Sequence, residues 1–296
     1  MRRYGDALLS ISTLSCLLLV LLILAVLIGD VVIHGGPRLT LGFLMDSPSA
    51  GMTEGGIFPA LFGTTALVIL MTLAGVPVGV ATAIYLSEYA APNSRFAWGV
   101  RLAVRNLAGV PSIVFGLFGL GFFVQFVGHG MDLALFGGEK VFGQPALLWA
   151  ALTMAVLTLP VVIVATEEAL RTVPDGLREG SLALGATKMQ MITSVLLPNA
   201  GPGILTGTIL AVSRGAGEVA PILFTGAAYF LPKLPSDLHG QFMHLGYHIF
   251  VLSTQSPDVD ATAPILYATV LVLLGVVFTL NLSAVLLRQR MRARLS

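Results

Sequence analysis

The chain has 296 residues, of which 56% are hydrophobic and only 10% are charged. Its mean hydropathy of +0.91 excludes an ordinary soluble domain, in which about 25% of residues are charged. The net charge of +1 gives no basic surface for nucleic acid, and the single cysteine, Cys16, excludes a disulfide framework. We therefore predict an all-α membrane protein that crosses the bilayer several times.

Six apolar segments are long enough to cross a bilayer as helices, which takes about 20 residues each. A secretory signal peptide is the alternative for the first segment, but its apolar run exceeds the about 7–15 residues of such peptides. We predict a single transmembrane domain over residues 1–296. Its spans are expected at residues 7–32, 57–86, 102–127, 146–166, 203–229 and 262–287.

Glycine and proline are expected to interrupt the second span at Gly75, Pro77 and Gly79. Such breaks are tolerated in a membrane where neighbouring helices satisfy the backbone. The five residues LAGVP occur at 73–77 and again at 107–111. We interpret both copies as the same helix-breaking chemistry.

Six spans place both ends of the chain on one side of the membrane. Cytoplasmic loops carry an excess of lysine and arginine. Only Arg38, Lys140 and Lys233 fall on the side opposite the two ends. We therefore predict that both termini and the polar loop at 167–202 are cytoplasmic. The cations on that side are Arg2, Arg3, Arg95, Arg101, Arg105, Arg171, Arg178, Lys188, Arg288, Arg290, Arg292 and Arg294.

The polar loop is expected to form two short helices, with Gly185 between them to end the first. Pro198, Gly201 and Pro202 are expected to end the second before the fifth span. A plain interfacial helix without a partner is the alternative. The second helix is predicted to be amphipathic at the membrane surface, from four apolar residues at helical spacing: Met189, Ile192, Val195 and Leu196.

The same loop resembles the EAA loop of ABC-importer permeases. That signature is Glu-Ala-Ala, three residues, Gly, nine residues, and Ile-x-Leu-Pro, whereas this chain has small residues in place of the alanines and valine in place of isoleucine. The resemblance implies a type I ABC-importer permease fold with a cytoplasmic coupling helix that docks on a separate ATPase. The coupling residues would be Glu179, Gly180, Ser181, Gly185, Leu197 and Pro198.

Three segments narrow the resemblance to the PstA-type permease subunits of phosphate importers. They are residues 106–119, 166–188 and 213–226. The implied complex lies in the bacterial inner membrane and contains a PstC-like permease, a PstB-like ATPase dimer and an external PstS-like phosphate-binding protein. ATP would be used by the ATPase, and this chain would hold no cofactor. A PstC-type role and a permease for another oxyanion, such as sulfate, are the alternatives.

Arg214 and Glu218 are the charged residues inside the predicted fifth span. Arg214 lies roughly 16 Å beyond Gly203, near the middle of the bilayer. An arginine there costs about 2.5–3.5 kcal/mol, and Glu218 four residues later can offset that cost. The pair could be structural only. Alternatively, Arg214 binds phosphate oxygens through paired hydrogen bonds while Glu218 favours release; the resemblance implies such a role.

Other residues give weaker indications. Arg171 lies where the fourth span is expected to leave the membrane, either as an interfacial anchor or at the cytoplasmic exit of an anion path. His239, His244 and His248 lack a metal-binding motif and are expected to line the outer loop. No G-x-x-x-x-G-K-[ST] motif occurs, so this chain is not expected to hydrolyse ATP. A carrier driven by an ion gradient and a membrane scaffold are the functions of other classes.

Overall fold

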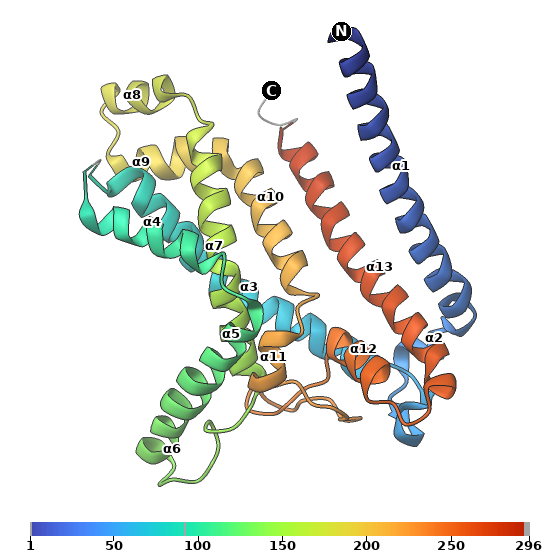
Figure 1. Ribbon diagram of the computed structural model, residues 1–296. Helices are drawn as coiled ribbons and strands as arrows, with labels where there is room; N and C mark the ends of the chain where they lie inside the picture. The colour runs from blue at the N-terminus through green and yellow to red at the C-terminus, as the bar shows by residue number, and fades with distance from the viewer. Residues whose placement is uncertain (1, 92, 293–296) are drawn as a thin grey trace.

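The computed structural model describes residues 2–91 and 93–292, with side chains from residue 9 to residue 291 (Figure 1). The start of α1 (Arg2–Gly35) and the end of α13 (Val259–Arg292) lie at the same end of the bundle as α8 (Asp175–Ala183). We call this the α8 end, and the opposite end the α12 end, after α12 (Leu245–Thr254). Of the cations used to predict sidedness, Arg294 lies outside the described residues, as do the side chains of Arg2, Arg3 and Arg292.

Six helical segments in the described part of the chain are long and apolar enough to cross a membrane, as predicted. The first segment ends in η1 (Gly36–Arg38). Between the first two segments lie α2 (Leu41–Met45) and a short hairpin whose strands β1 (Pro48–Ser49) and β2 (Glu54–Gly55) flank η2 (Ala50–Met52). The bounds of the six segments are Leu9–Arg38, Phe58–Tyr89, Ser112–Leu135, Leu147–Arg171, Lys188–Gly215 and Val259–Met291.

The predicted interruption of the second span is wrong. Helix α3 (Phe58–Ile84) runs through Pro77 and continues into the π-helical turn η3 (Tyr85–Tyr89). A Cβ at Gly75 would come within 3.3 Å of Ala155, and one at Gly79 within 2.7 Å of Val162. The glycines therefore allow close packing on α7 (Leu147–Arg171), and this packing supports an unbroken helix.

The third predicted span, 102–127, is wrong because these residues belong to two separate helices. Helix α4 (Arg95–Leu107) ends before Pro111, and a new helix begins at Ser112. The new helix passes through α5 (Ser112–Phe118), η4 (Gly119–Gly128) and α6 (His129–Leu135). Proline cannot donate a backbone hydrogen bond and restricts the residue before it, so the second LAGVP copy breaks the chain where no neighbour packs closely on its glycine.

The fifth predicted span, 203–229, is also wrong in its bounds. One continuous helix runs from α9 (Lys188–Met191) through the π-helical turn η5 (Ile192–Leu196) into α10 (Leu197–Gly215), so the prolines do not break it. In η5 the N–H of Leu197 donates to the carbonyl of Ile192, which changes the hydrogen-bond register just before Pro198. The chain breaks instead after Gly215, and the short helix α11 (Ala220–Thr225) follows.

The main core lies between α3, α7, α11, α12 and α13. Phe242 and Leu245, at the start of α12, are fully buried in it. His244 and His248 are buried there as well, so the prediction that they line the outer loop is wrong for these two. Most residues of α12 are apolar and pack into the core, so the two histidines are buried with them. Helix α1, by contrast, has no buried side chain along its membrane segment and meets α13 closely at Gly35.

Candidate functional site

A cavity of about 170 Å³ lies where the two broken helices face the middle of α7. One wall comes from the α4–α5 break, a second from the turn of α7 around Pro160, and a third from the last turn of α10, which contributes Arg214. The lining residues are Leu107, Ala108, Val110, Pro111, Ser112, Leu157, Thr158, Pro160, Val161, Ala211, Arg214 and Gly215.

Arg214 sits halfway along the bundle. A Cβ on the next residue, Gly215, would come within 2.8 Å of Met71 and 3.4 Å of Thr158. Met71 and Thr158 lie near the middle of α3 and α7, so the end of α10 is at the same level. The sequence placed this arginine near mid-membrane, and the packing of Gly215 agrees with that depth.

Glu218 pairs with Arg214, as its spacing predicted, although it lies in the turn after α10 and not on the helix. The Arg214 Nε and Glu218 Oε1 atoms are 3.5 Å apart. The Arg214 side chain is 67% exposed and that of Glu218 is 21% exposed. At this distance the pair is loose, and within the described residues the guanidinium has no other hydrogen-bond partner. Arg214 also lines the cavity, so an anion there would be beside the guanidinium.

The EAA-like loop forms an exposed helical hairpin at the α8 end. Gly185, with φ +87°, ends α8 as predicted: its N–H donates to Leu182, and the N–H of Ala186 donates to Ser181. Thr187 and Gln190 then form a capping box that starts α9. Leu184 between the helices is 91% exposed. Glu179, Gly180 and Pro198 are exposed, whereas Ser181 and Leu197 are half-buried.

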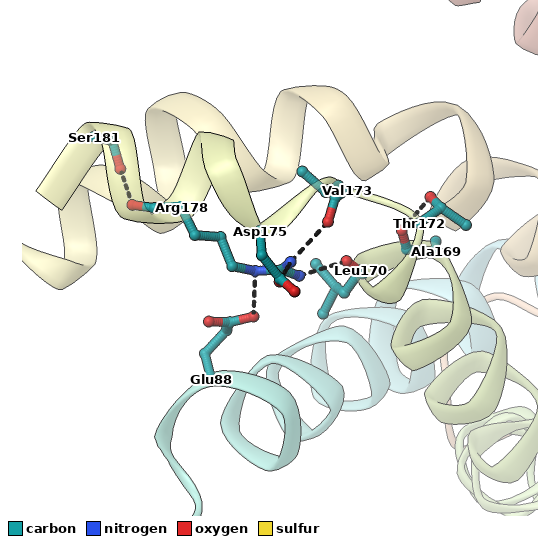
Figure 2. Close-up of polar contacts among 8 residues, drawn as sticks. All are labelled: Glu88, Ala169, Leu170, Thr172, Val173, Asp175, Arg178 and Ser181. Atoms are coloured by element: carbon teal, nitrogen blue, oxygen red, sulfur yellow. Dashed lines mark hydrogen bonds and ion pairs between the residues drawn. The ribbon is translucent and has the colours of Figure 1, made fainter.

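Arg178 holds this hairpin to the membrane helices (Figure 2). Its Nη1 and Nη2 donate to the carbonyls of Val173 and Leu170 at 2.7 and 2.6 Å, beyond and within the end of α7. The same guanidinium pairs with Asp175 at 2.7 Å and with Glu88 of η3 at 3.5 Å. The sequence analysis missed this cluster because Glu88 and Arg178 are far apart in the chain and no local spacing links them.

Arg171, the last residue of α7, lies on a polar groove of about 490 Å³ next to this cluster. Arg101 lines the groove too and is 3.1 Å from Glu167, while it also donates to the carbonyl of Leu86 at 2.7 Å. Three arginines and two carboxylates thus share the groove wall. Arg171 and Arg214 are not brought together, since the groove is at the α8 end and the cavity is at mid-bundle. No group of histidine, cysteine and acidic residues in the described part of the chain is arranged to hold a metal ion.

Comparisons with known proteins agree with this fold. A family model described as binding-protein-dependent transport system inner membrane component matches residues 75–293. The chain belongs to this family. It is therefore a multi-pass protein of the inner membrane and the permease component of an ABC importer, which works with an ATPase and a substrate-binding protein.

Several curated permeases are similar in sequence. The probable ABC transporter permease protein YqgI of Bacillus subtilis is 35% identical over 262 residues, which cover 84% of each chain. The phosphate transport system permease protein PstA 1 of Mycobacterium tuberculosis H37Rv is 34% identical over 235 residues, covering 79% of this permease and 70% of the relative. PstA of Haemophilus influenzae is 38% identical over 192 residues, covering 64% and 62%.

Solved importers share the fold at low sequence identity. A chain of a bacterial alginate ABC transporter, in complex with a pentasaccharide-bound periplasmic protein, has a TM-score of 0.67 and 17% identity, covering 94% of this permease and 93% of that chain. A chain of the MetNI methionine transporter, in an inward-facing conformation, has a TM-score of 0.57 and 20% identity, covering 80% and 94%. These likenesses establish the type I importer fold predicted from the EAA-like loop.

Proposed function

We propose that this permease carries inorganic phosphate into the cell as one half of a two-permease path. The names of the PstA relatives support phosphate as the substrate. The PstA-type segments of the sequence point the same way. The observation that carries the proposal is Arg214: a largely exposed guanidinium at mid-bundle, on a cavity, with a single loose partner among the described residues.

The chemistry of this site suits an oxyanion. A guanidinium presents paired N–H donors that match two oxygens of a phosphate. The helix Ser112–Leu135 also begins at the cavity, so the positive end of its dipole adds to the charge of Arg214. Half-helix N-termini of this kind face anionic substrates in other membrane transporters. The site therefore replaces part of the water shell that phosphate loses in the bilayer.

Glu218 gives the site a means of release. When no anion is bound, its carboxylate holds the guanidinium at 3.5 Å, so Arg214 is never an unpaired charge. An arriving phosphate competes with Glu218 for the same donors, which lowers the net affinity for the anion. A transport site needs such moderate affinity, because an anion bound too tightly would not leave.

We infer that the hairpin of α8 and α9 is the coupling segment, which docks on the ATPase. Of the six predicted coupling residues, Glu179, Gly180, Ser181 and Gly185 lie in α8 or at its end, whereas Leu197 and Pro198 begin α10, beyond the hairpin. The exposed Leu184 at the tip of the hairpin would enter a cleft of the ATPase. The α8 end, with both termini, is then the cytoplasmic side, and Arg171 lies at the exit of the path. ATP is used by the ATPase chains.

The partners follow from this assignment. A PstC-like permease forms the second half of the path, two PstB-like ATPase chains dock below, and a PstS-like binding protein delivers phosphate from outside. ATP-driven closure of the ATPase dimer moves the coupling segment, so that the path opens toward the binding protein. Hydrolysis of ATP then returns the path to the cytoplasmic side by alternating access.

Uptake of labelled anions tests the substrate. The complete complex is reconstituted in proteoliposomes together with its binding protein. It should take up labelled inorganic phosphate, and a tenfold excess of unlabelled sulfate should not compete. The alternative is a permease for another oxyanion. Uptake of sulfate without uptake of phosphate would establish that alternative and refute the proposal.

Docking of the coupling segment is tested separately. Leu184→Asp places a charge on the exposed tip and should reduce co-purification of the ATPase with the permease pair. Leu238→Asp, at an exposed leucine near the α12 end, is the matched control and should leave co-purification unchanged. Equal recovery of the ATPase with both variants would show that the ATPase docks elsewhere.

A further inference from the structure

The π-helical turn η3, at the cytoplasmic end of α3, is in contact with both arms of the coupling segment. Glu88 of η3 pairs with Arg178 of α8 at 3.5 Å. The next residue, Tyr89, lies under the ammonium group of Lys188 at the start of α9, 5.0 Å from the ring centroid. One turn of helix therefore contacts the two helices that we assign to ATPase docking.

The head of Arg178 is enclosed and is held by several groups at once. Its side chain is only 18% exposed and that of Glu88 only 9%. Three nitrogens of the guanidinium are engaged at once, with two backbone carbonyls at the end of α7 and with carboxylates on both sides. Figure 2 shows these groups converging on the one arginine head from α8, η3 and the end of α7. A shift of α8 that leaves η3 behind must break the Glu88–Arg178 pair, which joins the two elements.

Two routes lead from η3 to the cavity. The first is α3, a continuous helix from Phe58 through Tyr89, whose Met71 packs on Gly215 beside Arg214. The second is α4, tied to η3 where Arg101 donates to the carbonyl of Leu86, and ending at the cavity residue Leu107. Helices are stiff elements, so displacement of one end is carried to the other.

We propose that η3 transmits movement of the coupling segment to the cavity, and that Glu88 and Arg178 are positioning residues for this step. Neither residue lines the cavity that contains Arg214. The inference rests on the assignment of α8 and α9 as the coupling segment. Loss of the Glu88–Arg178 link should leave the ATPase docked and active, but should separate its cycle from the conformation of the cavity.

Accessibility of a cavity cysteine tests the proposal without reference to the transported anion. In the complete complex, Cys16→Ser removes the native thiol and Ser112→Cys places a reporter on the cavity wall. The rate of its modification by a water-soluble methanethiosulfonate is measured with and without ATP plus vanadate. The rate should change about tenfold in the reporter complex, and by less than about twofold once Glu88→Gln or Arg178→Gln is added.

Controls separate transmission from assembly. Arg95→Gln removes an exposed arginine at the start of α4 and should keep the full response. Arg178→Lys can keep the charge pair but not the paired carbonyl bonds, and should give an intermediate response. Retention of the wild-type response in Glu88→Gln and Arg178→Gln would overturn the proposal. So would the absence of any ATP response in the reporter complex, or loss of ATPase binding in these variants, because that loss would assign the residues to docking instead.

Discussion

Two arginines of this permease pair with carboxylates, but they differ in exposure and in the number of their partners. Arg178 at the α8 end is 18% exposed and has four partners, of which three lie at 2.7 Å or closer. Arg214 at mid-bundle is 67% exposed and has one partner at 3.5 Å in the described part of the chain. The donors of Arg178 are used in contacts within the protein, whereas most donors of Arg214 have no partner among the described residues.

The difference separates two uses of the same side chain. A guanidinium whose donors are all satisfied fixes the positions of the groups around it, and removing it leaves buried partners unpaired. A guanidinium with free donors in a region that excludes water is costly for the protein on its own. Its presence is explained when an anion completes its hydrogen bonds, so the contrast favours a substrate role for Arg214 and a positioning role for Arg178.

The largest effect on stability is expected at Arg178. Arg178→Ala leaves Glu88 buried without its partner and two carbonyls uncapped, which costs about 3 kcal/mol. For the purified permease this should lower Tm by roughly 5–10 °C. Arg214→Ala should change Tm by less than about 2 °C, because one loose contact is lost. Thermal unfolding of both variants measures the contrast, and equal losses of Tm would remove it.

Asp132 provides a second satisfied charge, near the opposite side of the membrane. It is fully buried, and its carboxylate accepts from the N–H groups of Val141, Phe142 and Gly143 at 2.7–3.2 Å. Asp132→Ala leaves these donors without an acceptor and should cost about 2 kcal/mol. The variant should unfold at a Tm several degrees lower. It should also be cleaved faster by protease between residues 136 and 146. Unchanged Tm would show that the loop holds its shape by other contacts.

Glu218 should have a moderate effect of another kind. Glu218→Gln keeps the shape of the side chain but removes the charge that competes with the anion for Arg214. Phosphate should then bind more tightly and leave more slowly, so both KM and the maximal uptake rate should fall by about threefold to tenfold. Initial rates over a range of phosphate concentrations test this. A raised KM would show that Glu218 helps to bind the anion rather than to release it.

Arg171 should have the smallest effect. As an exposed cation on the polar groove at the α8 end, it attracts anions only through solvent that contains salt. Arg171→Gln should lower uptake by less than about twofold at low ionic strength and should have no effect at high ionic strength. A larger loss that persists in salt would place Arg171 in direct contact with the substrate.

Much of the fold could be predicted from the sequence because the bilayer imposes simple lengths. Six apolar runs gave six spans, and Gly185 marked the end of α8 through its need for positive φ. The spacing of Arg214 and Glu218 indicated their pairing. These features depend on residues close together in the chain, where periodicity and backbone preference act directly.

The breaks could not be predicted in the same way. The two LAGVP copies are identical in sequence, yet the first lies within α3 and the second ends α4. Packing of Gly75 against Ala155 supports the first, whereas no other helix of the described residues packs on Gly109 in this way. The Glu88–Arg178 link and the Arg101–Glu167 pair were missed for a related reason, since partners from distant segments meet only once α3, α4 and α7 have packed.

The most direct test of the account is phosphate uptake by the complete complex carrying Arg214→Gln, with assembly and ATP hydrolysis measured on the same sample. Arg95→Gln is the matched control. If Arg214 binds the anion, assembly and hydrolysis should persist while uptake falls about a hundredfold, because two charged hydrogen bonds of about 1.5 kcal/mol each are lost. Uptake within about twofold of the control would show that Arg214 is a structural charge and would contradict the central claim.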